Sequence, residues 1–312
     1  MSRPLEPDIN AYGTYGRVEA LADWLEVAAL AGRRVTRAQL EDMIFDNGWT
    51  RLSPQQFLLP DGMEEEATPE SWVEAVHSTL QRREQVLGVK WPFEIVGSWR
   101  VKKRPGANTV VPYTAMLALS VAHAWNVATT HKPEVLLEAT IARALSGFGL
   151  AVAPVGTGTS FSGGFPEVMR QAAASLGIRC DPDAAPRKKS AKDEGVDTLA
   201  LLGWPSDPRL AGQWVFVGQA TVARSNEWYK KLMEPRRDHW RSRLIQPLEP
   251  QRFLVVPHQV ASEYLTHLVG NDTGVVIDRL RLALVLDDVT GEERLVLDEI
   301  LAAGVSDGRA AA

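Results

Sequence analysis

The chain has 312 residues and a net charge of −5, and 45% of its residues are hydrophobic against 23% charged, which excludes an intrinsically disordered chain. Its single cysteine, Cys180, excludes an intramolecular disulfide and a cysteine-based structural zinc site. The lone cysteine, with an N-terminus that lacks a basic-then-apolar export signal, predicts a cytoplasmic protein.

Residues 1–130 are predicted to form a mainly helical N-terminal region. The stretch "RVEALADWLEVAALAG" repeats apolar residues at helical spacing, and Gly32 is expected to end that helix. Thr36, followed three residues later by Gln39, predicts a second helix that starts with a capping box. A third amphipathic helix is expected from Thr68 onward.

The next two segments are predicted to be a strand and a buried helix. "WPFEIVGSWRVKK", residues 91–103, alternates enough for a strand. Residues 110–130 carry no formal charge and are long enough to span a bilayer. Five polar, aromatic or proline residues lower the apolar character of this segment: Pro112, Tyr113, Ser120, His123 and Asn126. We therefore expect a buried core helix over 112–127 and no membrane association.

Residues 131–312 are predicted to form an α/β domain with C-terminal helices. A helix is expected over 132–150, with Pro133 in its first turn, and 252–258 forms a compact apolar run typical of a buried strand. The segment 276–288, "VIDRLRLALVLDD", is expected to be helical, with the charges of its "DRLR" part either paired internally to dock the C-terminal helices or facing a partner subunit. Strands that alternate with helices are typical of an α/β fold.

Two apolar strands, 196–202 and 213–221, each carry one polar residue at a notable place. Asp197 opens the first, and Gln219 interrupts the second directly after Gly218. The turn-rich connection predicts antiparallel neighbours, which would put both side chains at the same end of the sheet. Magnesium prefers oxygen ligands and takes only one or two carboxylates from a protein, so the sequence predicts a magnesium site here, with the Ala220 carbonyl as a third ligand.

Glu138 is a further acidic candidate. On the helix from 133 it shares a face with Ile141, Ala142 and Leu145, so its carboxylate is either at the edge of that helix or directed toward a buried positive group. Glu134 lies in the first turn, where the helix dipole alone explains an acid. We therefore prefer Glu138 for the site.

These residues together resemble the PD-(D/E)xK nuclease superfamily over about residues 133–260, in particular its Mrr-like branch, which carries Gln in place of Glu. The resemblance implies a restriction-endonuclease-like mixed sheet flanked by helices. It also implies an endonuclease that depends on Mg²⁺ (or Mn²⁺) and cleaves DNA phosphodiester bonds, in bacterial defence against phage or foreign DNA. Glu138 resembles the helix acid, Asp197 the central metal ligand and Gln219 the second ligand.

The chain departs from the motif at one position. The motif lysine should stand two residues after Gln219, but Thr221 is there. Lys230 or Lys231 in the next helix is expected to take its role, with Lys230 favoured because it is nearer the helix start. The alternative is a catalytically inactive nuclease-fold subunit that binds nucleic acid or a partner ATPase or helicase; a third option is an interaction subunit without nucleic-acid contact.

Basic residues concentrate around the two strands. Between 187 and 243 there are twelve Lys and Arg against seven Asp and Glu, an excess of +5, so the rest of the chain carries −10. Seven of the basic residues are expected to contact DNA phosphates without reading sequence: Arg224, Arg236, Arg237, Arg241, Arg243, Lys188 and Lys189. Trp228 and Trp240 are expected to be packing residues. A homodimer and a sensor subunit remain open.

Overall fold

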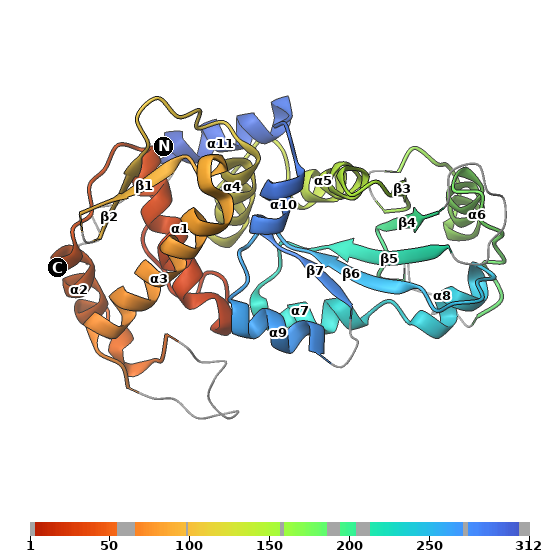
Figure 1. The fold of residues 1–312 in the computed structure, drawn as a ribbon, viewed down its shortest axis with the longest axis horizontal. Helices are drawn as coiled ribbons and strands as arrows, with labels where there is room; N and C mark the ends of the chain where they lie inside the picture. The colour runs from red at the N-terminus through yellow and green to blue at the C-terminus, as the bar shows by residue number, and fades with distance from the viewer. Residues whose placement is uncertain are drawn as a thin grey trace.

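A mixed five-stranded sheet with helices on both faces forms the centre of one half of the molecule (Figure 1). The computed structural model describes residues 4–54, 66–97, 99–156, 159–185, 194–203, 213–270 and 274–305. The helices are α1 (Arg17–Leu30), α2 (Arg37–Asp46), α3 (Pro69–Leu87), α4 (Pro112–Ala124), α5 (Pro133–Gly147), α6 (Phe165–Ser175), α7 (Ser225–Met233), α8 (Arg237–Arg243), α9 (Ser262–Val269), α10 (Arg279–Val285) and α11 (Gly291–Ala303). The strands are β1 (Phe93–Val96), β2 (Arg100–Lys103), β3 (Ala151–Pro154), β4 (Thr198–Leu202), β5 (Trp214–Ala220), β6 (Gln251–Val255) and β7 (Val275–Ile277). The predicted α/β class is confirmed.

The five-stranded sheet has the order β3-β4-β5-β6-β7. β3, β4 and β5 pair antiparallel, whereas β5, β6 and β7 pair parallel. In the β4–β5 hairpin Thr198 lies opposite Gly218 and Leu202 lies opposite Trp214. The antiparallel pairing expected for these two strands is therefore confirmed.

Alternating side chains of the sheet face two different helical layers. Ala200 and Phe216 belong to the core shared with α5, α4 and α10. Leu199 and Val217 pack with α6 and α8 instead, and Leu254 packs with α7 and α9. The sheet thus separates α5 on one side from α7 on the other (Figure 1).

The N-terminal region has the predicted helices and one difference. The capping box of Thr36 and Gln39 is formed at the start of α2, and Thr68 caps α3. The uncharged helix is α4, buried from Tyr113 to Ala122. Among the described helices, none combines the length and the apolar composition of a membrane span. Residues 91–103 form not one strand but the antiparallel pair β1–β2, and the positive φ of Gly97 (65°) allows the chain to reverse there.

The segment 276–288 is helical only in part. Val275–Ile277 forms β7, because these β-branched residues find a parallel partner in β6. The helix α10 begins at Arg279, and the Asp278 side chain caps it by accepting a hydrogen bond of 3.1 Å from the Arg281 N–H.

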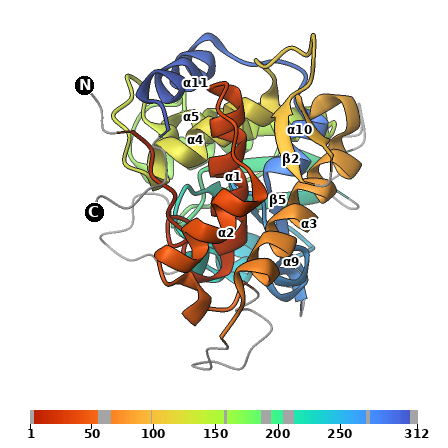
Figure 2. The ribbon, with the colours of Figure 1, turned by 90° about the vertical axis from the view of Figure 1, so that its left-hand side faces the viewer.

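The C-terminal helices pack on the N-terminal region. α11 lies against α4 (Figure 2), and α10 contacts α3 and α4. Leu5 forms a parallel bridge with Val305. A single hydrophobic core contains Leu21 of α1 together with Phe253 and Val255 of β6. The two halves of the sequence therefore share one core.

Candidate functional site

Asp197 is held firmly at the start of β4. Its N–H donates to the Gly218 carbonyl at 2.9 Å, and its carbonyl accepts from Val155 and Gly156 at 2.7 and 2.9 Å. One carboxylate oxygen, Oδ2, accepts from the Ala220 N–H at 2.9 Å. The carboxylate of this half-buried residue is thus fixed against the end of β5.

The backbone of Ala220 faces the same way as Asp197. A strand residue whose N–H points to one neighbouring strand points its carbonyl to that strand too. The Ala220 carbonyl therefore lies on the Asp197 side of β5. One step beyond the Thr198–Gly218 pair, the register brings Gln219 opposite Asp197. Two predicted ligand residues and the predicted carbonyl thus lie at one end of the sheet, where the sequence places them.

The Gln219 side chain is turned toward α7. It is only 5% exposed, and its Nε2 donates to the Lys231 carbonyl and to Oε2 of Glu234, both at 2.8 Å. The Lys231 ammonium lies 3.0 Å from the same Glu234 oxygen. Lys230 points elsewhere: it lies 3.5 Å from Glu227, and its side chain is 72% exposed. Of the two candidate lysines, the geometry brings Lys231 and not the favoured Lys230 to Gln219.

Thr221, at the motif-lysine position, has a local structural role. Its N–H donates to the Val255 carbonyl at 2.9 Å, which ends the β5–β6 pairing. Its hydroxyl accepts from the Ala223 N–H at 3.1 Å, a turn that short hydroxyl side chains favour. The chain therefore turns toward α7 at the point where the motif would present a lysine.

Glu138 lies in a different layer from Gln219. It is half-buried on α5, which packs against β3, β4 and β5. The helix α7, to which the Gln219 side chain is hydrogen-bonded, lies on the other side of the sheet (Figure 1). The expectation that Glu138, Asp197 and Gln219 present their oxygens together stays a prediction: the register places Asp197 opposite Gln219, and Glu138 belongs to a helix on the other face of the sheet.

The predicted phosphate-binding arginines differ widely in exposure. Arg224 and Arg241 are exposed, Arg236 is 63% exposed and lies 2.7 Å from Asp238, and Arg237 is 17% exposed and lies 3.4 Å from Glu249. Arg241 also donates to the Gln246 carbonyl at 3.3 Å. Lys188 and Lys189 lie outside the described residues.

The expectation that Arg243 contacts DNA is wrong. This arginine is fully buried, forms an ion pair with Glu194 and donates to the Pro182 carbonyl at 3.2 Å. Its guanidinium lies 5.6 Å from the ring centre of the equally buried Trp240. A phosphate outside the fold cannot reach it. The packing roles predicted for Trp240 and for Trp228 (1% exposed) are confirmed.

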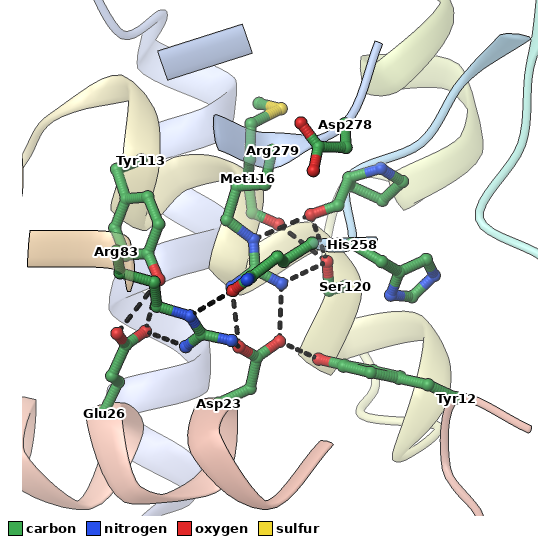
Figure 3. Close-up of polar contacts among 12 residues, drawn as sticks. Tyr12, Asp23, Glu26, Arg83, Tyr113, Met116, Ser120, His258, Asp278 and Arg279 are labelled. Carbon is green, nitrogen blue, oxygen red and sulfur yellow. Dashed lines mark hydrogen bonds and ion pairs between the residues drawn. The ribbon is translucent and has the colours of Figure 1, made fainter. Parts of the chain in front are cut away.

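A second polar cluster, which the sequence reasoning largely missed, lies between α1, α3, α4 and α10 (Figure 3). Asp23 stands between two guanidiniums: Nη1 of Arg279 at 2.7 Å and Nη2 of Arg83 at 2.8 Å from its Oδ1. Arg83 also lies 2.9 Å from Glu26, which accepts from the Tyr113 hydroxyl at 2.7 Å. The internal ion pair expected near 278–281 exists, but its acidic partner is in the N-terminal region.

This cluster is structural. Asp23, Glu26 and Arg279 are fully buried, so no substrate reaches them. Burial raises the pKa of Asp23, but Arg279 and Arg83 outweigh it, and the pKa of Asp23 lies below its ordinary value. The sequence does show acidic and basic residues inside apolar helical stretches, which is a signal for buried ion pairs. Which of these residues pair depends on how α1, α3, α4 and α10 pack together.

The ligand set that the sequence predicts at the end of β4 and β5 has the chemistry of a magnesium site rather than a zinc site. Within the described ranges, no three His, Cys, Asp or Glu side chains gather as a metal site. Asp197, the Gln219 amide oxygen and the Ala220 carbonyl would supply one carboxylate and two neutral oxygens, and magnesium usually completes such a set with water.

Comparison with protein-family models, curated proteins and solved structures found no match to this chain.

Proposed function

We propose that the chain is a magnesium-dependent nuclease that cleaves DNA phosphodiester bonds, with a restriction-endonuclease-like sheet. One observation carries the proposal: Asp197 and Gln219 oppose each other at one end of the β4–β5 hairpin, with Lys231 beside Gln219. The mixed sheet flanked by helices agrees with what the PD-(D/E)xK resemblance implies.

Each residue has a defined chemical part in this proposal. Asp197, Gln219 and the Ala220 carbonyl would hold Mg²⁺, which when bound would supply polarisation of the scissile phosphate and a more acidic water. Asp197 is fixed for this by the Ala220 N–H. The Lys231 ammonium stabilises negative charge that develops on the phosphate. Exposed arginines such as Arg224 and Arg236 hold the DNA backbone, which predicts binding that weakens steeply with salt.

Cleavage of linear DNA and plasmid with and without Mg²⁺ tests the proposal. Asp197→Ala should lower the rate at least about 100-fold, the scale on which mutation of a metal ligand or charge-stabilising donor acts. Asp46→Ala, which removes an exposed acid at the end of α2, is the matched control and should cleave as the native chain does. Circular dichroism and a thermal melt check that both variants stay folded. Equal cleavage by Asp197→Ala would remove this residue from the reaction.

The second candidate function is a non-cleaving subunit of the same fold that binds nucleic acid or a partner ATPase or helicase. Thr221 in place of the motif lysine favours it, because Thr221 is committed to a turn. DNA binding that falls with salt, together with no cleavage at any Mg²⁺ or Mn²⁺ concentration, would support this function over the first. Parallel assays on RNA distinguish the substrate.

A further inference from the structure

The amide of Gln219 has only one orientation that fits its partners. Both acceptors of Nε2, the Lys231 carbonyl and the Glu234 carboxylate, lie at 2.8 Å. A primary amide has two N–H donors and one oxygen, and neither partner can donate to that oxygen. Both N–H groups are therefore directed at α7, so Oε1 points away from α7.

Glu234, directly after α7, joins two groups through one oxygen. Its Oε2 takes the Gln219 N–H at 2.8 Å and lies 3.0 Å from the Lys231 ammonium. Both neighbours are donors, so this carboxylate oxygen accepts a hydrogen bond from each of them.

The start of β4 leaves room for this carboxylate. Gly195, two residues before Asp197, has a φ of +74°, and a Cβ there would lie 2.9 Å from the Glu234 Cβ and 3.4 Å from Gln219 Nε2. Any larger residue at 195 would press on Glu234 and be strained as well. The loop into β4, the end of β5 and the end of α7 therefore meet at Glu234.

We propose that Glu234 is a positioning residue, which fixes the Gln219 amide with Oε1 turned away from α7 and holds the Lys231 ammonium beside it. The effect of Glu234 on catalysis rests on the proposed nuclease function, whereas its placement of the Gln219 amide does not. An outer partner of this kind sets the orientation of a ligand that binds metal directly, and losing it typically costs 10–100-fold in metal affinity or activity. No position of the nuclease motif calls for an acid here.

Side-chain amide NMR of the metal-free protein tests the geometry directly. The Gln219 N–H₂ signals, identified by their loss in Gln219→Ala, should be shifted and protected from exchange in the native chain. Glu234→Ala should bring them to the position of exposed amides and speed their exchange at least about tenfold. Glu234→Gln should largely keep them, because its amide oxygen still accepts from Gln219. Glu227→Ala, which removes an exposed acid of α7 paired only with Lys230 among the described residues, is the control and should change nothing.

Metal binding and cleavage give the second readout. Glu234→Ala should weaken Mg²⁺ binding in calorimetry about 10–100-fold and lower kcat with KM for DNA unchanged, because Glu234 touches no phosphate. Unchanged Gln219 signals in Glu234→Ala would overturn the positioning role whatever the cleavage assay shows. A different outcome is that the native chain neither binds Mg²⁺ nor cleaves DNA, while its Gln219 signals are protected and lose this protection in Glu234→Ala. That outcome would uphold the positioning role and reject the nuclease.

Discussion

Replacing Asp23 with alanine should destabilise the fold severely, because this carboxylate balances two buried guanidiniums. Arg279 and Arg83 lie 2.7 and 2.8 Å from one of its oxygens, and the Tyr12 hydroxyl donates to the other. Removing one partner of a buried ion pair costs about 3–5 kcal/mol. Since two guanidiniums and a hydroxyl lose an acceptor together, we expect about 5 kcal/mol, a large part of a total stability of about 5–15 kcal/mol.

Urea unfolding followed by tryptophan fluorescence measures this loss. With a slope of about 3 kcal/mol per molar urea, the midpoint for Asp23→Ala should fall by about 1.5 M. Asp298→Ala removes an acid whose side chain is 58% exposed and whose nearest basic contact, Arg294, lies at 3.9 Å. This control should stay within about 0.5 kcal/mol of the native chain.

A double variant separates an unbalanced charge from simple loss of packing. Asp23→Leu with Arg279→Met removes both members of one pair and leaves Arg83 with Glu26 at 2.9 Å. Because no charge is then stranded, the double variant should be more stable than Asp23→Ala by about 2 kcal/mol or more. A loss below about 1 kcal/mol in Asp23→Ala, or a double variant less stable than the single, would refute the reasoning.

Two further predictions concern pH and close packing. Burial raises the pKa of Glu19 to about 7, above the 4.5 of an unperturbed glutamate, so the folded state keeps a proton that the unfolded chain loses; the free energy of unfolding should fall by roughly 3 kcal/mol between about pH 4.5 and 7. Glu19→Gln should abolish that part of the fall in urea titrations at successive pH values, and an unchanged pH profile would contradict the assignment. A Cβ at Gly218 would lie 2.1 Å from the Phe253 carbonyl oxygen, so Gly218→Ala should cost roughly 3 kcal/mol or more in thermal or urea unfolding. Gly291→Ala, with open space around it, should cost nothing, and equal stability of the two variants would rule out the close contact.

Elements with strong local signals were predictable from the sequence. The capping residue Thr36 and the first-turn Pro133 mark helix starts where the structure has them. The turn-rich connection also gave the β4–β5 pairing, and with it the placement of Asp197 opposite Gln219. Val276 and Ile277 were predicted as helix because a short apolar run fits either structure, and only the neighbouring β6 makes them part of a strand.

The details of the site depended on packing that no local pattern encodes. Gln219 faces α7 because α7 covers that side of the sheet, and the same packing selects Lys231 over Lys230. Arg243 looked like the other arginines of its helix, but Glu194 lies close enough to pair with it and bury it. Whether a charged residue is buried depends on a partner that is distant in sequence. The sequence alone therefore could not distinguish the buried Arg243 from the exposed arginines.

The helix that carries Lys231 is itself held by the N-terminal region. Its N-cap residue, Arg224, makes no side-chain cap, and the Ser225 N–H donates instead to the Tyr12 carbonyl at 2.8 Å. The Thr14 N–H donates to Asn226 Oδ1 at 3.0 Å. Because free N–H groups at a helix start must find acceptors, the Tyr12 carbonyl does for α7 what a capping side chain does elsewhere. The N-terminal region therefore helps to position α7, so a fragment that starts at residue 131 would lack contacts that hold this helix in place.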